Sequence, residues 1–553
     1  MDQNPVIDFI MAQNPCRSEE MDLNWSVVRI IKYIACSPHL TELDELVKSE
    51  IEAFKHREAG NRFYRERNLV KAMDCYNQSI CYAQLDSEQL GMGYANRSAV
   101  CLEQGDYEYA LFNIDLAKKH NYPEKQMPKL LVRERNCKQR IADGHSKGTV
   151  PSPRINLNVN TNPRIPFLAN GIAMTYDSRF GRGLIAEKDF NVGDMILDEK
   201  IELGAHNFFM SYLQCNQCFA NYSQLLIPCP TCVLFMYCSK ECRELSWKLY
   251  HRFECGVASK LCCVSGSGDM IFPRLFFYGL SQFGDDLQAM MEYCEKKVSR
   301  ESNPLDVDYT NLDRLDVFKT LHNTHRRKLE SSQGGKRGVA SYYVVYLMNP
   351  AVRSIIRTES HRRFFLRSLL LYSSMLYPLA TTHSIDGHLS AVVRPIGSLL
   401  NHSCDPHAIQ TFDSGRWKVI LIRPVQKGEQ IFMTYGPAWW QQTPAVVMTF
   451  KCQCVVCDQG KAGQEWHSLK MRQYSSKALL KDMRVLNEIF EKDDVHIAAR
   501  LIALQQFIKR YAHYHPNATF LAGMLQHYSN FLTKACTIEE DALVRAKLQA
   551  KFV

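Results

Sequence analysis

Apolar residues recur at helical spacing in the first part of the chain and again near its end. Residues 54–140 and 465–553 show this pattern, for example in the run VHIAARLIALQQFIKRYAHYH. Between them, residues 172–199 and 395–435 have the character of strands separated by turns such as SRFGRG and NVGD, whereas residues 270–385 are mostly helical in pattern. The chain is therefore predicted to be an α+β protein with helical ends around a β-rich centre.

The first helical stretch contains an internal repeat, with two units related by an offset of 38 residues. Matching positions hold Gly60 and Ser98, Ala72 and Ala110, and Tyr76 and Ile114. Small residues at fixed offsets let two helices pack closely, and the larger ones fill the groove beside them. The units resemble the tetratricopeptide repeat (TPR), whose period is about 34 residues. An ordinary helical bundle is the alternative.

Composition is that of a globular protein with one exception. The chain has 553 residues, of which 46% are hydrophobic and 23% charged, so we expect roughly three to four domains. Its net charge of +9 permits contact with nucleic acid without requiring it. The first residues do not resemble a secretory signal, and the most apolar stretch, 364–380, is interrupted by Arg367 and Pro378, which indicates a buried helix. The exception is cysteine, with 21 residues; in a chain expected to be soluble and intracellular, clustered thiols indicate metal.

The densest cysteine cluster lies between residues 215 and 255. Its candidate ligands are seven thiols and one imidazole: Cys215, Cys218, Cys229, Cys232, Cys238, Cys242, His251 and Cys255. Two-residue gaps let paired thiolates bind one ion, and three-residue gaps place both ligands on one face of a helix. Eight such ligands suit two tetrahedral zinc ions, which would supply much of the folding energy of so small a piece.

The spacing, together with Tyr237 and Trp247, resembles the MYND zinc finger, whose two sites interleave. The resemblance implies one zinc bound by Cys215, Cys218, Cys238 and Cys242. It implies a second bound by Cys229, Cys232, His251 and Cys255. Fingers of this kind bind proline-rich peptides or steady a neighbouring domain.

Three further motifs surround the finger: GRGL at 181–184, SLLNHSCD at 398–405 and QIFMTYGP at 430–437. In this order they resemble a SET domain, the fold of many protein-lysine methyltransferases. A MYND finger inserted in a SET domain, with repeats ahead of it, identifies the chain as a member of the SET-and-MYND family, in its TPR-bearing branch. The resemblance covers about residues 54–460.

The resemblance implies a site for S-adenosylmethionine. Its cofactor-binding residues would be Gly181, Arg182, Gly183, Asn401, His402, Tyr435 and Phe450, the last against the adenine. Tyr435 would also be catalytic, because its hydroxyl orients the attacking amine and the methyl group. Transfer of a methyl group from a sulfonium to an amine requires positioning, desolvation and electrostatics, and a dry channel favours the neutral amine.

A third metal site is indicated by FKCQCVVC, which supplies Cys452, Cys454 and Cys457. Three thiolates leave one zinc position open. The resemblance fills it with Cys404 of the NHSC motif, as in a post-SET zinc site. We therefore expect three zinc ions in all, two in the finger and one here.

Some positions depart from the family pattern. Met448 stands where active members usually carry a second tyrosine of the lysine channel, and Thr381 stands where an asparagine is common. Two functions therefore remain open. The first is a methyltransferase that acts on lysines of histone or non-histone proteins. The second is a catalytically weak or inactive scaffold, including one in transcriptional regulation. A DNA-reading zinc-finger protein is a third hypothesis, but MYND resembles DNA-reading fingers only in holding zinc.

The expected partners are protein substrates, proline-rich peptides at the finger and chaperone or other peptides at the TPR helices. A carboxylate clamp on those helices would use Asn61 and Asn96 with Arg62 and Arg97 beside them. We expect a cytoplasmic and nuclear monomer without membrane contact or direct DNA binding.

The expected segments are N-terminal helices (1–48), TPR-like repeats (49–141), a linker (142–165), the first part of SET (166–214), the finger (215–255), a helical insert (256–394), the SET core (395–449), the post-SET segment (450–460) and C-terminal helices (461–553).

Overall fold

The computed structural model describes residues 30, 31, 34, 35, 40, 42–147, 159–206, 208, 212–264, 270–296, 303–311, 313–324, 333–385, 388–413, 415–441, 451–492 and 496–553. Most of the expected N-terminal helical segment lies outside these residues, as do Met448 and Phe450. No helix in the described ranges combines the length and the apolar character needed to span a bilayer.

The repeat region forms helices α4 (Glu50–Arg65), α5 (Leu69–Tyr82), α6 (Glu88–Glu103), α7 (Tyr107–Lys119) and α8 (Met127–Ala142). Serine side chains cap the first helix of each repeat: Ser49 accepts a hydrogen bond from the Glu52 amide, and Ser87 accepts one from the Leu90 amide. A Cβ added at Gly60 would come within 2.5 Å of the Tyr76 ring, which confirms that α4 and α5 pack closely where the small residue was noted.

Three sheets form the β-rich centre. The first has the order β1 (Thr161–Asn162), β2 (Ile165–Ala169), β5 (Met195–Lys200), β13 (Arg416–Leu421) and β12 (Ala408–Asp413). The second has the order β11 (Asn401–His402), β14 (Gln430–Met433), β4 (Gly181–Ala186) and β3 (Ile172–Asp177). The third has the order β6 (Leu203–His206), β10 (His388–Val393) and β9 (Ala380–Ile385). The centre is thus β-rich as predicted, although β1 begins inside the stretch expected to be linker.

The finger follows β6 and the helical insert follows the finger. The finger contains the hairpin β7 (Ile227–Pro228) and β8 (Met236–Tyr237), then α9 (Lys240–Ser246), a π-helical turn (Trp247–His251) and α10 (Arg252–Glu254). The insert contains α11 (Ala258–Val264), α12 (Ile271–Gln282), α13 (Leu287–Glu295), α14 (Arg314–Thr324), α15 (Gln333–Met348), α16 (Pro350–Ile355) and α17 (Glu359–Leu379). The helical pattern ends earlier than expected, because β9 begins at Ala380.

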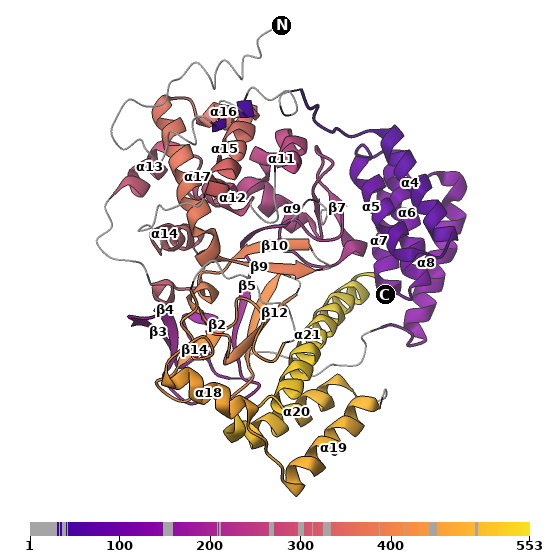
Figure 1. Ribbon diagram of the computed structural model, residues 1–553. Coiled ribbons are helices and arrows are strands. Elements are labelled where there is room, and N and C mark those ends of the chain that lie inside the picture. Colours follow the sequence, from indigo (N-terminus) through magenta and orange to yellow (C-terminus); the bar gives the residue numbers. More distant parts are fainter. Residues whose placement is uncertain are drawn as a thin grey trace.

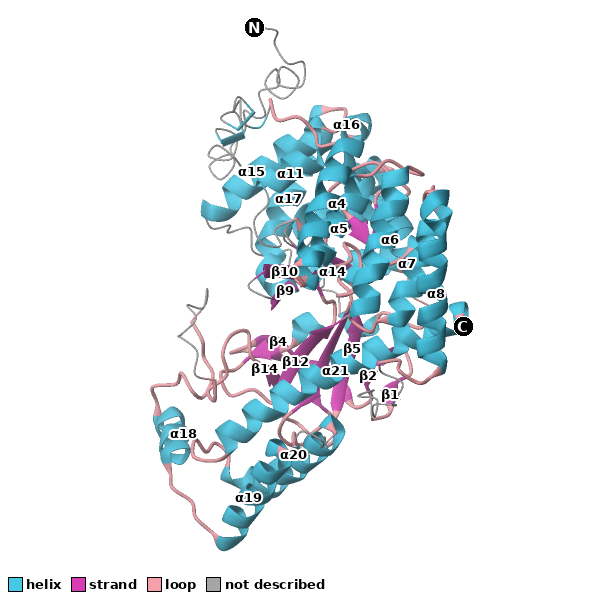
Figure 2. Ribbon diagram, turned by 90° about the vertical axis from the view of Figure 1, so that its right-hand side faces the viewer, coloured by secondary structure: helices cyan, strands magenta, loops and turns pink. Residues whose placement is uncertain are grey.

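The C-terminal region is helical as predicted, with α18 (Lys461–Met471), α19 (Lys477–Glu491), α20 (Ile497–Tyr511) and α21 (Leu521–Phe552). Figure 2 shows α18, α19 and α20 at the opposite end of the molecule from α11, α15 and α16. The end of α21 returns to the repeat helices (Figure 1). There the buried Arg545 pairs with Asp106 at 2.6 Å and Glu108 at 3.0 Å.

The repeat helices also contact the finger through polar side chains of α5, α6 and α7. Asn77 donates to the carbonyls of Tyr212 and Ser223, and the buried Arg97 donates to the carbonyl of Leu226 at 2.7 Å. The suggestion that Arg97 lines a peptide clamp is therefore wrong. Its guanidinium is enclosed between the repeats and the finger, because it satisfies a main-chain carbonyl there.

Candidate active site and zinc clusters

The sheet of β4, β14 and β11 brings together the residues expected to hold the cofactor. Asn401 pairs with Phe432 in parallel, and Gln430 pairs with Ile185 across β4. The Asn401 side chain donates from Nδ2 to the Arg182 carbonyl at 2.8 Å. Two motifs more than 200 residues apart in sequence are thus joined by a hydrogen bond between β11 and β4, the two neighbours of β14.

The glycine turn leaves room for a ligand beside Asn401. Gly181 has a positive φ of +76°, and a Cβ there would meet no atom within 4 Å. A Cβ at Gly183 would instead lie 2.8 Å from Asn401 Nδ2. Within the described residues, no hydrogen bond occupies the Asn401 side-chain oxygen, so this oxygen can accept a bond from an ammonium group. These features fit the amino-acid end of S-adenosylmethionine.

Tyr435 follows β14 and is tied to residues 400–402 at both ends. Its hydroxyl donates to the Leu400 carbonyl at 2.7 Å, and its backbone amide donates to His402 Nδ1 at 3.0 Å. The residue is 47% exposed, so one side of the ring faces the surface. Enclosure of the hydroxyl end raises the pKa of Tyr435, against the lowering effect of the Arg394 charge. The phenol therefore stays protonated at neutral pH and acts as a hydrogen-bonding group rather than as a base.

Arg394 is a buried cation near the site that the sequence did not reveal. Its guanidinium lies 3.8 Å above the centre of the Trp417 ring, and its Nε and Nη1 have no hydrogen-bond partner among the described residues. Burial lowers the pKa of Arg394 to about 10, while the charge of Glu199 acts in the opposite direction. Glu199 accepts bonds from the Ile396 and Gly397 amides, and its own burial raises its pKa to about 7. Arginine is usually exposed, so its burial could not be predicted from its type.

The finger brings its eight predicted ligands into two groups. In the first finger cluster, defined by Cys215, Cys218, Cys238 and Cys242, all sulfur atoms lie within 4.8 Å of one another. In the second finger cluster, defined by Cys229, Cys232, His251 and Cys255, the ligand atoms satisfy the same limit. The imidazole enters through Nε2, at 3.2 Å from Cys229 Sγ and 3.6 Å from Cys232 Sγ. Four soft ligands around one point fit a closed tetrahedral zinc site.

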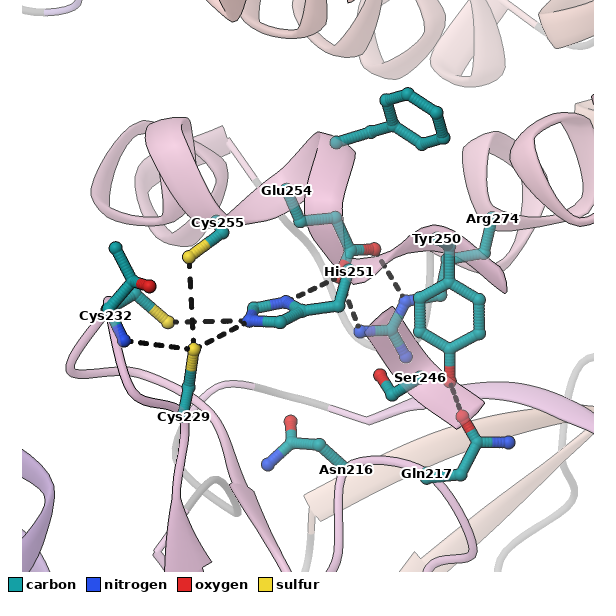
Figure 3. A network of polar contacts seen from close by, with 12 residues as sticks. Asn216, Gln217, Cys229, Cys232, Ser246, Tyr250, His251, Glu254, Cys255 and Arg274 are labelled. Atoms are coloured by element: carbon teal, nitrogen blue, oxygen red, sulfur yellow. Dashed lines mark hydrogen bonds and ion pairs between the residues drawn. The ribbon is translucent and has the colours of Figure 1, made fainter. Parts of the chain in front are cut away.

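The second finger cluster has an outer layer that the sequence did not predict (Figure 3). On the far side of the imidazole, His251 Nδ1 lies 3.5 Å from the Glu254 carboxylate. Glu254 in turn pairs with Arg274 at 2.7 Å, and Arg274 donates to the Gly204 carbonyl of β6 at 2.7 Å. Although burial acts to raise the pKa of Glu254, the charge of Arg274 holds it below its ordinary value. This chain of contacts orients the ligand and attaches the finger to the SET sheet.

The post-SET cluster, defined by Cys404, Cys452, Cys454 and Cys457, also brings its four sulfur atoms within 4.8 Å. It joins β11 to the segment that follows residues 442–450, across a sequence separation of about 50 residues. The Cys404 amide donates to Cys454 Sγ at 3.4 Å. Unlike the second finger cluster, it includes ligands that are partly exposed, and Cys457 is exposed.

Asp405, the residue after Cys404, is a second feature that the sequence did not predict. Its buried carboxylate accepts hydrogen bonds from the indoles of Trp439 and Trp466, both at 3.0 Å, and contacts His515 Nε2 at 2.8 Å. Burial would raise the pKa of Asp405, but the charge of Arg423 and the hydrogen bonds from His515 and Trp466 hold it well below its ordinary value. The contacts fix α18 and the loop before α21 against the NHSC segment.

Comparison with known proteins shows what this site resembles. The model of the SET domain matches residues 181–436. The chain is 21% identical over 538 residues to protein-lysine N-methyltransferase SMYD4 of Pongo abelii, covering 73% of this chain and 66% of that protein. It is 23% identical over 283 residues to histone-lysine N-methyltransferase ASHR1 of Arabidopsis thaliana, covering 50% of this chain and 53% of that protein. The chain thus spans about two thirds of the length of the SMYD4 relatives it matches.

Among solved structures, the crystal structure of the SET domain of LSMT bound to lysine and AdoHcy is 10% identical, with a TM-score of 0.23 over 70% of this chain and 89% of that one. The matched SET segment contains the glycine turn, the NHSC motif and Tyr435, and both finger clusters lie inside it. Matches to SMYD4 proteins of several vertebrates cover 73–75% of this chain and 66–68% of those proteins. The chain is therefore similar to the SMYD4 members of the SET-and-MYND family.

Proposed function

We propose that the chain transfers a methyl group from S-adenosylmethionine to lysine side chains of protein substrates, histone or non-histone. The observation that carries this proposal is that one sheet brings together the Gly181–Gly183 turn on β4, Asn401 on β11 and Tyr435, which follows β14 between them. When bound, the cofactor supplies an activated methyl group on its sulfonium. The names of the SMYD4 and ASHR1 relatives give the same activity to those proteins.

The chain's own residues would bind and orient the reactants. Asn401 would accept a hydrogen bond from the cofactor's ammonium group, and the turn at Gly181 would let the backbone lie against it. The Tyr435 hydroxyl already donates to Leu400, so its oxygen can accept a bond from the substrate amine and hold the lone pair of that amine toward the methyl group. Exclusion of water would favour the neutral amine. The amine must lose its proton to solvent before attack, because the protonated phenol cannot take it.

Calorimetric titration with S-adenosylhomocysteine tests the cofactor site. We expect binding by the zinc-loaded protein and its loss in Asn401→Ala, while Gln426→Ala, an exposed change in the turn before β14, leaves binding unchanged. Tyr435→Phe should bind the ligand normally but transfer methyl groups more slowly. Absence of binding by the folded wild-type protein would contradict the proposal and favour the scaffold function.

We further propose peptide partners for the repeats and the finger. On the repeats, Asn61 and Asn96 lie side by side, with an amide hydrogen bond of 2.9 Å, and Arg62 is exposed near them. On the finger, the Trp247 ring is 45% exposed, which suits binding of a proline-rich peptide. The backbone at Cys232 is not available to such a peptide, because it already pairs with the backbone at Val47. Fluorescence anisotropy with labelled acidic and proline-rich peptides would test both sites.

We also propose that the protein is a monomer of the cytoplasm and nucleus that does not bind DNA directly.

A further inference from the structure

His402 connects two parts of the site through opposite sides of its ring. Its Nε2 lies 3.4 Å from the sulfur of Cys404, a member of the post-SET cluster. Its Nδ1 lies 3.0 Å from the backbone nitrogen of Tyr435. The residue is 5% exposed, so water does not compete strongly for these contacts.

The direction of both hydrogen bonds follows from the chemistry of the partners. A backbone N–H can only donate, so Nδ1 of His402 must be the acceptor and carries no proton. The proton of the neutral ring is then on Nε2, which points to Cys404. When zinc is bound, Cys404 is a thiolate and the Nε2–H group donates to it. Hydrogen bonds to outer-layer partners of this kind orient a ligand and tune the metal.

Tyr435 is tied to residues 400–402 by two hydrogen bonds. Its hydroxyl is held by the Leu400 carbonyl and its amide by His402, so both contacts lead back to residues 400–402. The rings of His402 and Tyr435 are also close, with centroids 5.4 Å apart. Any shift of Cys404 that displaces the imidazole therefore reaches the amide of Tyr435 directly.

We propose that His402 is a positioning residue that couples occupancy of the post-SET cluster to the placement of Tyr435. The coupling deepens the proposed function, because it concerns the tyrosine that would orient the amine. Zinc in the post-SET cluster holds Cys404, Cys404 holds the ring of His402, and the ring holds the Tyr435 amide. Loss of that one zinc disturbs the reaction centre, while the two finger zincs stay in place.

The first test measures release of zinc to a chelator with a colorimetric zinc indicator. His402→Phe keeps a ring of similar size but removes both hydrogen bonds. We expect one of the three zincs to leave about 10-fold faster in this variant, with the other two unchanged. The matched control is His407→Phe, since His407 is also buried and accepts a bond from the Phe432 amide at 3.2 Å but has no contact with a cluster cysteine in the described structure. Equal release rates in wild type and His402→Phe would overturn the proposal.

The second test observes Tyr435 without measuring catalysis. 3-Fluorotyrosine is placed at position 435 and its fluorine resonance is recorded before and after removal of the fastest-leaving zinc. We expect the resonance to move in the wild-type background and in His407→Phe, and to stay in place in His402→Phe, whose tyrosine is already uncoupled. An equal movement in all three proteins would contradict the coupling. Neither test depends on methyl transfer, so failure of the proposed function would appear separately, as absent binding of S-adenosylhomocysteine.

Discussion

The second finger cluster and the post-SET cluster use similar ligands in different surroundings. All four finger ligands are buried, and the outer partners Glu254 and Arg274 are buried with them. The finger cysteines also belong to the largest apolar core, together with α12 and α15 of the insert. Here the metal replaces a hydrophobic core that a segment of about 40 residues cannot build alone.

The post-SET cluster is partly exposed, and its outer partner His402 belongs to the proposed reaction centre. His402 contacts a ligand of its cluster, as Glu254 does in the finger. Its other contact is with Tyr435, whereas the other contact of Glu254 is a buried ion pair. The number of ligands therefore does not define the role of a zinc site. The outer layer does: one cluster stabilises the fold, and the other is suited to hold the geometry of the site.

The largest effect is expected for Cys229→Ser. This change removes a ligand from the buried second finger cluster, and structural zinc contributes about 10–16 kcal/mol to the folding of such units. We expect the zinc content to fall from three per chain and the finger to unfold, as measured by metal analysis and thermal unfolding. Cys262→Ser, at an exposed cysteine outside the clusters, is the control. Unchanged stoichiometry would show that Cys229 is not a ligand.

The next largest effect is expected for Arg274→Met, which changes the outer layer of the second finger cluster. Arg274→Met leaves the buried Glu254 carboxylate without its guanidinium partner, and breaking a buried ion pair costs about 3–5 kcal/mol. We expect a decrease of that size in the free energy of unfolding, measured with urea. Arg67→Met, which removes an exposed pair with Glu103, should change stability by about 1 kcal/mol or less. Equal effects of the two variants would mean that the buried pair does not support the finger.

The ligands of the finger could be predicted from the sequence, because ligand spacing is a local property. The two- and three-residue gaps of the finger indicated its ligands, and the small residues of the repeats indicated close helix pairs. The outer layer could not be predicted, because Glu254 meets Arg274, and His402 meets Tyr435, only after the chain has folded. The family resemblance, not spacing, supplied Cys404 to the post-SET cluster.

The sequence did not predict the boundary between α17 and β9 or the docking of the C-terminal helices, and both failures have physical reasons. Strand β9 follows directly on α17 with no loop between them, so hydrophobic periodicity did not locate the boundary. The C-terminal helices were predicted from their amphipathic pattern, but their docking was not. It depends on buried polar groups such as Arg545 and Asp405, whose residue types are usually exposed.

A smaller effect is expected at Asp405, which lies beside the post-SET cluster but acts on the fold. Hydrogen bonds to a charged group contribute about 1.5–3 kcal/mol, so Asp405→Asn should lower the free energy of unfolding by about 2 kcal/mol at pH 7. The folded pKa lies below the unfolded value of about 3.9, so the stabilisation is present above that pH and is lost as the pH falls further. Urea unfolding of both proteins from pH 7 to pH 3 should show the difference shrinking only below about pH 4. A difference that stays constant over this range would contradict the ionic role.

The smallest effect on stability is expected for Cys457→Ser. Its size shows whether the second finger cluster and the post-SET cluster have different roles. Cys457 is an exposed ligand of a cluster that belongs to none of the apolar cores of the described residues, so its loss should remove one zinc and lower the free energy of unfolding far less than Cys229→Ser does. Metal analysis should give two zincs per chain, and thermal unfolding should remain close to that of the wild type. Loss of stability as large as in Cys229→Ser would show that the post-SET cluster also determines the fold. A small loss, accompanied by a shifted fluorine resonance at Tyr435, would instead separate the two roles, because the same metal would then govern the reaction centre without holding the protein together.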